Sequence, residues 1–424
     1  MPQTMGSPSG RYSRTSRTVL QFDLSHLTPE AQLLVLLART SVNGTLHVEI
    51  QDRLRDQIDW DLLWRLARAH GVAPLVYRTL LSHGSGAVPK ATLEAFRRHV
   101  QANTILNSLL TGELVSLVDA FAAKGIRAIP FKGPTLAVTA YGDPTLRECV
   151  DLDLIVEQSS ILQARQLMWS RGYQLTSLVS SHGDEQDEVF HSFVKKNGIF
   201  RVDLQWVMAR RLFSFRLDQE RFYDQLKPVR IGQKTVMALA TEELLIVLCI
   251  HGSKHAWEDL KWVCDVAELL RRRRAIDWSR VLFLSQEWGS RRMLFMGLAM
   301  ARTLFDTPLP RLVQDAIAAD RDIRDLAKRM PKRLLRAGQE GVDETDAEAL
   351  YLTLKDSWVE QWKYGLALCH AEVPVVTKPL LWFRLQGRLN TLNQLFHPFR
   401  RAAAWCVRFL RVKKLLLRWL ETPG

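Results

Sequence analysis

The chain has 424 residues, of which 47% are hydrophobic and 24% charged, a balance that excludes wholesale disorder and fits about two or three structural units. Lys and Arg number 58 against 45 Asp and Glu, a formal net charge of +13 that favours anionic partners such as phosphates, nucleic acid or an acidic membrane face. The five cysteines are far apart and form no Cys-x-x-Cys pair, so neither a disulfide scaffold nor a thiolate zinc site is expected.

The N-terminus and the apolar runs indicate a cytoplasmic protein. The first 17 residues are rich in Arg and Ser and lack the apolar stretch of a secretory signal. The longest apolar runs, Leu33–Ala38 and Leu244–Ile250, are much shorter than the roughly 18 residues that a membrane span needs. We therefore expect a reducing, cytoplasmic location.

Blocks of helical and strand pattern follow one another along the chain. The polar, basic residues 1–22 predict a mobile tail, and leucines at three- to four-residue spacing predict an N-terminal helical region over 23–125. A strand-like period predicts an α/β core over 126–238, helices return over 239–375, and 376–424 reads as a basic amphipathic helical tail. The predicted fold class is α+β, with a small mixed sheet flanked by N- and C-terminal helical regions.

The predicted core contains five strands and a separate hairpin. The strand candidates are Ile126–Phe131, Val150–Val156, Tyr173–Val179, Val189–Lys195 and Ile199–Val207. Lys132-Gly133-Pro134 is expected to end the first strand and open a helix, and a further hairpin is expected over Pro228–Met237. The tripeptide Ile-Asp-Trp at 58–60 and 276–278 predicts two helix starts, each capped by its Asp.

Acidic residues alternate with apolar ones in the second strand candidate. Asp151 and Asp153 should project from one face of that strand, and two carboxylates so placed repel each other unless a cation lies between them. Asp203, on a later strand, offers a third carboxylate. Three aspartates on neighbouring strands suit Mg²⁺, and a pair of such ions can activate a hydroxyl and stabilise a leaving pyrophosphate. An Asp-x-Asp pair alone also occurs without catalytic function.

Lys132-Gly133 adds a second element to the carboxylates. A cation and backbone donors at a helix N-terminus suit a triphosphate, and glycine permits close approach of the backbone. Taken alone, the dipeptide could be a simple strand-to-helix turn. Because it precedes Asp151, Asp153 and Asp203 in this order, the dipeptide favours a catalytic site over a simple turn.

The ordered set resembles the nucleotidyltransferase superfamily that has a DNA polymerase β-like palm. In particular it is similar to a bacterial branch of largely uncharacterised nucleotidyltransferases with a Lys-Gly element, an Arg and then Asp-x-Asp-Leu-Val. The matching stretches are Phe131–Leu136, Tyr141, Arg147, Asp151–Val156, Gly172-Tyr173 and Val202–Trp206, with His70–Pro74 before them and His251–His255, Trp262 and Asp265 after them. The resemblance covers roughly residues 30 to 310.

The resemblance implies transfer of a nucleoside monophosphate from an NTP, with ATP as the default, to the hydroxyl of an unidentified acceptor, with Mg²⁺ and release of pyrophosphate. It implies that Asp151 and Asp153 ligate the metal, and that Asp203 completes the metal site and helps to deprotonate the acceptor. Lys132 and Gly133 would hold the β and γ phosphates. The chain departs from the usual pattern because Lys132-Gly133 replaces Gly-Ser and because Gln205 stands where relatives commonly carry His.

Two further groups of residues leave alternatives open. Arg147 either neutralises phosphate charge or pairs with Asp151. His251 and His255 share a helix face, which is either a polar surface packed on the core or part of a nucleotide or acceptor site with Lys254 as a phosphate partner. The zinc-protease pattern is not met, because Gly252 stands where a Glu is required.

The C-terminal segment 378–420 contains ten Lys or Arg residues, no acidic residue and several aromatic ones. Such a segment either contacts an anionic membrane surface or RNA, or packs on its own protein with a basic outer face. Besides the enzyme, two other functions therefore stay open: a catalytically weakened nucleotide-binding accessory protein of a biosynthetic pathway, and a membrane-surface or RNA-binding adaptor.

Overall fold

The architecture is that of a computed structural model, which describes residues 27–177, 190–206, 223, 225–273, 275–337, 350–357 and 361. The predicted tails over 1–22 and 376–424, including the basic segment 378–420, lie outside the described residues. The elements follow the predicted order: helices, then strands, then helices.

Five helices precede the sheet. They are α1 (Pro29–Leu37), α2 (Gly44–Arg53), α3 (Trp60–Ala69), α4 (Ala73–His83) and α5 (Lys90–Ala123). The side chains of Thr28, Asn43 and Asp59 accept hydrogen bonds from the first turns of α1, α2 and α3, which satisfies backbone donors that a helix start leaves free. The predicted cap at Asp59 is therefore confirmed.

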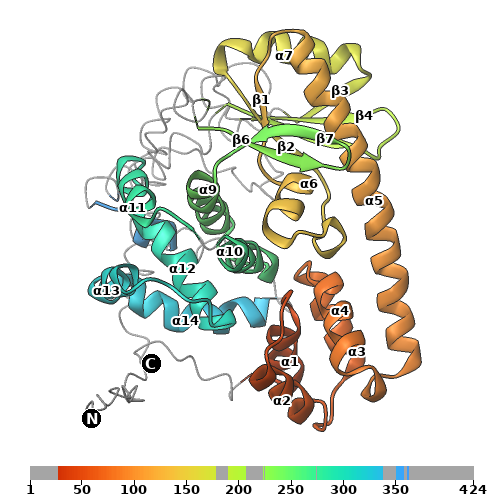
Figure 1. The fold of residues 1–424 in the computed structure, drawn as a ribbon, viewed down its shortest axis with the longest axis vertical. Coiled ribbons are helices and arrows are strands. Elements are labelled where there is room, and N and C mark those ends of the chain that lie inside the picture. The colour runs from red at the N-terminus through yellow and green to blue at the C-terminus, as the bar shows by residue number, and fades with distance from the viewer. Residues whose placement is uncertain are drawn as a thin grey trace, which may run out of the picture.

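Helix α5 is a single helix of 34 residues that runs along one side of the molecule, from the first helices to the sheet (Figure 1). By length and composition alone it could cross a membrane, which the short apolar runs of the sequence did not lead us to expect. Its residues Leu110, Leu114, Leu117 and Phe121 belong to the hydrophobic core beneath the sheet. In this fold α5 therefore acts as a packing element.

The main sheet has five strands in the order β1-β2-β5-β4-β3. They are β1 (Ala128–Pro130), β2 (Leu152–Val156), β3 (Tyr173–Ser177), β4 (Phe190–Lys195) and β5 (Arg201–Gln205). Strands β2 and β5 are parallel and the other neighbours antiparallel, so the predicted small mixed sheet is confirmed. Strands β6 (Lys227–Ile231) and β7 (Lys234–Ala238) form the predicted separate hairpin.

The two faces of the sheet meet different cores. On β2, Leu152, Leu154 and Val156 face a core shared with α5 and α7 (Ile161–Ser170). Ile155, which lies on the same face as Asp153, belongs to the larger core formed by the helices before and after the sheet. The acidic face of β2 is thus directed at the helical part of the molecule.

The helices after the sheet share that larger core with the helices before it. They are α9 (Thr241–Lys254), α10 (Leu260–Arg272), α11 (Trp278–Glu287), α12 (Arg291–Phe305), α13 (Arg311–Ala319) and α14 (Arg321–Ala337). Leu33 of α1, Trp257 of the α9–α10 connection and Phe305 of α12 belong to one cluster of buried residues. Figure 1 shows α1–α4 and α9–α14 on the side of the sheet away from α7, while α5 runs from these helices to the sheet. Regions that the sequence suggested as separate are therefore joined by one core.

Candidate active site

Asp153 and Asp203 lie opposite each other on neighbouring strands. The parallel register of β2 and β5 pairs Asp153 with Asp203, and the antiparallel register of β5 and β4 pairs Asp203 with Ser192. Paired residues of adjacent strands project from the same face. The Ser192 hydroxyl donates a hydrogen bond of 2.5 Å to Oδ1 of Asp203. The register thus builds a row of polar side chains across the sheet, and Ser192 is a member that sequence reasoning missed, since only the strand pairing identifies it.

Asp151 lies directly before β2, which begins at Leu152, so the predicted strand starts too early. The reason lies in the close approach of Gly133. Gly133 has a φ of +56°, and a Cβ atom at this position would lie 3.0 Å from the backbone oxygen of Asp151. The turn after β1 thereby packs against the backbone that carries Asp151, and it brings the Lys-Gly element next to the carboxylates.

The predicted strand-to-helix turn at Lys132-Gly133-Pro134 is confirmed. Helix α6 (Gly133–Leu136) begins at Gly133, has Pro134 in its first turn and continues as a π-helical turn over Ala137–Tyr141. Gly142, with a φ of +76°, ends this helical segment. Proline suits the first turn of a helix because its missing N–H would have no partner there. The phosphate-binding role of Lys132 and Gly133 stays a prediction.

The three carboxylates are close enough to perturb one another. Burial raises the pKa of Asp151 to about 6, and the negative charges of Asp153 and Asp203 add to this rise while Lys132 opposes it. Burial also raises the pKa of Asp203, with Asp153 as the second cause. Like charges in a buried site disfavour joint ionisation. The structure therefore brings Asp153 and Asp203 together and places Asp151 within reach of their charges, while the meeting of all three around metal ions and their catalytic roles stay predictions.

Lys132 neutralises the acidic face that we expected to be either wet or metal-bound. Its Nζ lies 2.7 Å from Oδ1 of Asp153, and both side chains are largely buried, with 10% and 3% of their surface exposed. Gln205, at the end of β5, donates a hydrogen bond of 3.1 Å from Nε2 to the same oxygen. A buried carboxylate needs such partners, because an unpaired buried charge is costly.

The donor set fits a divalent cation in kind but is not assembled around one. Within the described residues, no group of three or more His, Cys, Asp or Glu side chains is arranged so that it could hold a metal ion. Lys132 and Gln205 hold Asp153, and Ser192 holds Asp203. Carboxylates are nevertheless the hard oxygen ligands that Mg²⁺ prefers. A bound cation would have to displace these partners to bring the oxygens together.

Arg147 pairs with Asp265 and not with Asp151, while its contact with phosphate stays a prediction. Its guanidinium forms a buried bidentate ion pair with Asp265 of α10, with Nε–Oδ1 and Nη2–Oδ2 distances of 2.8 and 3.0 Å. The hydroxyl of Tyr141 donates a hydrogen bond of 2.7 Å to Asp265. Asn107 of α5 donates to the backbone oxygen of Arg147 at 2.8 Å. Arg147 thus anchors the loop that leads into Asp151, and the expected pairing with Asp151 is wrong.

The C-terminal end of α9 borders the site from the helical side. The rings of His251 and His255 contact each other with centroids 4.6 Å apart, and both contact Trp262. Burial lowers the pKa of His251 well below its ordinary value, and the charge of Lys132 adds to this effect. Desolvation by neighbouring groups, and then the charge of Lys254, lower the pKa of His255 to about 3, although the residue is exposed at the surface.

Lys254 lies at the same end of the sheet as Gln205. Its Nζ is 5.4 Å from the ring centroid of Phe190, the residue of β4 that pairs with Gln205 of β5. The structure thus places the predicted phosphate partner near the strand ends, while its contact with a nucleotide stays a prediction.

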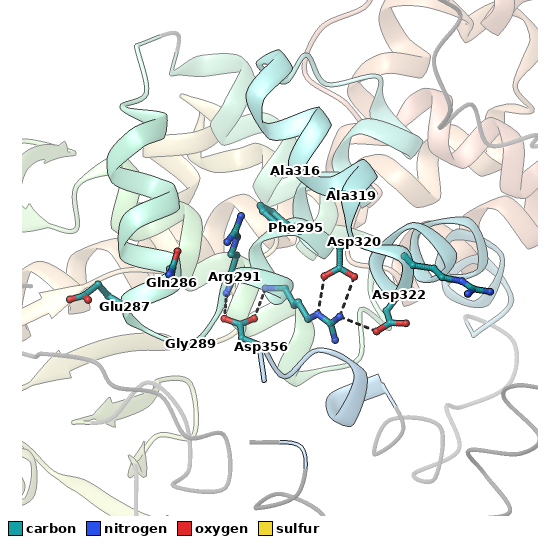
Figure 2. A pocket seen from close by; sticks show the side chains of 12 residues that line it. Gln286, Glu287, Gly289, Arg291, Phe295, Ala316, Ala319, Asp320, Asp322 and Asp356 are labelled. Carbon is teal, nitrogen blue, oxygen red and sulfur yellow. Dashed lines mark hydrogen bonds and ion pairs between the residues drawn. The ribbon is translucent and has the colours of Figure 1, made fainter. Parts of the chain in front are cut away.

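A cavity of about 740 Å³ lies elsewhere, between α11, α12, the start of α14 and residues 350–357 (Figure 2). On its wall Arg292 pairs with Asp320 and Asp322, and Asp356 accepts hydrogen bonds from the first backbone N–H groups of α12. None of the residues that line it belongs to the carboxylate site. We therefore place the candidate active site at the sheet.

Comparison with known proteins agrees with the resemblance. No curated protein is significantly similar to the chain. The crystal structure of an antigenic nucleotidyltransferase-like protein from Paracoccidioides brasiliensis is 15% identical, with a TM-score of 0.31, over 53% of this chain and 92% of that one. A family model described as an uncharacterised nucleotidyltransferase matches residues 56–306, a range that includes every described site residue named above. This chain therefore belongs to that family of nucleotidyltransferases and is a transferase.

Proposed function

We propose that the chain is a metal-dependent enzyme that transfers a nucleoside monophosphate from an NTP, with ATP as the default, to the hydroxyl of an acceptor. The observation that carries the proposal is the pairing of Asp153 with Asp203 on adjacent parallel strands, with Asp151 at the entry to the first of them. Three neighbouring carboxylates beside a glycine turn suit divalent-cation chemistry on a triphosphate.

In the proposed reaction the acceptor oxygen forms a bond to the α-phosphorus, and the bond from this phosphorus to the α–β bridging oxygen breaks. Pyrophosphate leaves with the electron pair of that bond, and the hydroxyl proton passes to Asp203. A raised pKa makes Asp203 a stronger base than an ordinary carboxylate. Asp151, Asp153 and Asp203 would hold Mg²⁺, which when bound would neutralise charge on the triphosphate and on the attacking oxygen.

The remaining residues would bind the nucleotide or position the carboxylates. The Lys132 ammonium has three N–H donors, so its pairing with Asp153 leaves donors for the β and γ phosphates. Gly133 lets the backbone approach those phosphates, and Lys254 would contact the nucleotide from the helical side. Arg147, which is committed to Asp265, acts through the loop that carries Asp151 and not through direct contact with phosphate.

Pyrophosphate release tests the proposal. The purified chain is incubated with Mg²⁺, each of the four NTPs labelled at the α-phosphate, and a small-molecule and protein extract as the source of acceptors. We expect labelled product and pyrophosphate from the wild type, and a loss of at least about a hundredfold in Asp151→Asn and Asp153→Asn. Asp119→Asn is the matched control, because Asp119 lies on the exposed face of α5 and pairs only with Lys234 among the contacts described.

The accessory-protein alternative has one observation in its favour, since Lys132 and Gln205 both occupy the same oxygen of Asp153. It predicts that the wild type binds NTP, measured by calorimetry, and releases no pyrophosphate with any acceptor. Turnover that disappears in Asp153→Asn would exclude this alternative. Turnover that persists in Asp153→Asn would exclude the enzymatic proposal at this site.

A further inference from the structure

Lys132 is a buried cation fixed inside the carboxylate site. It stands at the N-cap of α6, one residue before Gly133, whose positive φ and close contact with Asp151 leave the turn little freedom. Its Nζ lies 2.7 Å from Oδ1 of Asp153 and 5.3 Å from the ring centroid of Phe131. The backbone and the side chain of Lys132 therefore hold its positive charge next to Asp153, one of the proposed metal ligands.

The oxygen that Lys132 contacts is already fully used. Oδ1 of Asp153 accepts from the ammonium of Lys132 and also from the amide of Gln205. A carboxylate that bridges two cations about 4 Å apart gives one oxygen to each of them. With Oδ1 occupied by two protein donors, Asp153 has one oxygen left for a metal ion.

The net charge of the site also favours a single divalent cation. Asp151, Asp153 and Asp203 carry three negative charges when ionised, and Lys132 returns one positive charge, which leaves two negative charges. One divalent cation neutralises them, whereas two would leave the site with a net positive charge before any nucleotide binds. Gln205, a neutral amide, contributes no charge to this balance.

We propose that Lys132 serves as the fixed second cation of the active site, so that the chain binds one divalent ion where a two-ion mechanism would bind two. The inference rests on the proposed function, because it assigns a role to Lys132 within the same site. The ammonium bridges Asp153 and the triphosphate, and its charge is present at any metal concentration. Lys132 is thus a catalytic residue in addition to a phosphate ligand.

Manganese binding tests this assignment without reliance on turnover. Mn²⁺ is titrated into the metal-free protein, free Mn²⁺ is followed by its electron paramagnetic resonance signal, and the titration is repeated with α,β-methylene-ATP present. We expect one protein-bound Mn²⁺ per chain in the wild type, beyond what the analogue binds alone, with the spectrum of an isolated ion. We expect Lys132→Met to bind two ions with an exchange-coupled spectrum, because the loss of the ammonium makes the site more negative and leaves only the amide of Gln205 on Oδ1 of Asp153 among the contacts described.

Two variants separate charge from shape. Lys132→Arg keeps the positive charge and should keep one ion per chain. Lys234→Met removes a surface lysine that pairs with Asp119 and should leave the titration unchanged. Circular dichroism shows whether Lys132→Met is folded, and two ions in the wild type overturn the inference even if that variant is not.

Two coupled Mn²⁺ ions in the wild type would overturn the inference while leaving the proposed function intact if pyrophosphate is still released. A single ion in both the wild type and a folded Lys132→Met would also overturn it. No saturable Mn²⁺ binding in the wild type would overturn the inference and the metal-dependent function together.

Discussion

Gly133 meets two separate requirements, a positive φ and room for the backbone of Asp151. Gly133→Ala should therefore strain the turn by roughly 1 kcal/mol and also push Cβ against the Asp151 oxygen. We expect a larger loss of nucleotidyl transfer, at least about tenfold, than the fall in stability explains, because the carboxylate itself is displaced. Gly232→Ala is the control, since Gly232 has a φ of +60° and no atom within 4 Å of the added Cβ.

The two substitutions are compared by urea unfolding and by pyrophosphate release. Equal losses of activity in both variants would show that strain alone matters and that the contact between Gly133 and Asp151 does not position the carboxylate.

His251 predicts a pH-dependent stability of the folded chain. Its pKa is lowered by burial and by the charges of Lys132, His255, Lys254 and Arg147, so the folded chain does not bind the proton that the unfolded chain binds below about pH 6.5. Stability should therefore fall as the pH drops through this value. In His251→Gln, the loss between pH 7.5 and 5.5 should be smaller by about 1 kcal/mol.

Urea unfolding at the two pH values measures this difference. His47→Gln, on the exposed surface of α2, is the control and should show the pH dependence of the wild type. If His251→Gln loses as much stability between the two pH values as the wild type, other groups account for the acid sensitivity.

At the scale of elements, the loop from Gly142 to Asp151 is held by both α5 and α10. Asn107 binds its backbone from one side and Asp265 binds Arg147 from the other. Asp265→Asn leaves a buried guanidinium without its charge partner, which should cost about 3 kcal/mol in the free energy of unfolding. Arg147→Met combined with Asp265→Leu should recover most of that stability, because the double change removes both charges.

The exposed pair of Arg55 and Asp52 provides the comparison, since Asp52→Asn should cost less than about 0.5 kcal/mol. If the double variant regains stability but not activity, Arg147 positions Asp151. If it regains both, the ion pair serves the fold alone.

Local patterns predicted the elements but not their pairing. Alternation of Asp and apolar residues identified the strands of Asp153 and Asp203, and Asp277 caps α11 as its tripeptide indicated. The register that joins the two strands, and with it the contact of Asp203 with Ser192, depends on long-range pairing that short windows do not contain. The strand that carries Asp153 also begins two residues later than alternation alone suggested, at Leu152 and not at Val150.

At the scale of the whole molecule, the partners of the candidate site come from distant parts of the chain. Arg147 and Asp265 are 118 residues apart in the sequence. Lys132, which neutralises Asp153, was expected to bind phosphate. The family resemblance identified Arg147, Asp265, Lys132 and Asp153 in the sequence. Their charges and spacing alone did not predict which of them form pairs. The same holds for the common core of the helices before and after the sheet.

Trp257 is one of the largest fully buried side chains of that common core. It follows α9 in a left-handed backbone conformation, with a φ of 54°, and its indole packs against Gly252 of α9 and Gly297 of α12. A Cβ at Gly252 would lie 2.5 Å from the indole ring, so the ring has no room to yield without leaving its pocket. Packing around Trp257 enforces the strained backbone of the α9–α10 connection. Displacing Trp257 should therefore loosen both the helices that precede the sheet in the chain and those that follow it.

Gly252→Ala should therefore lower the free energy of unfolding by about 2–3 kcal/mol and increase amide hydrogen exchange in α1 and α12 together. Gly112→Ala, in the middle of α5, is the matched control, because nothing lies within 4 Å of its added Cβ and alanine favours a helix by up to about 1 kcal/mol. Faster exchange in α12 with α1 unaffected would mean that the two groups of helices unfold separately. Faster exchange in both, with the sheet following, would mean that the carboxylate site is held by a single cooperative unit.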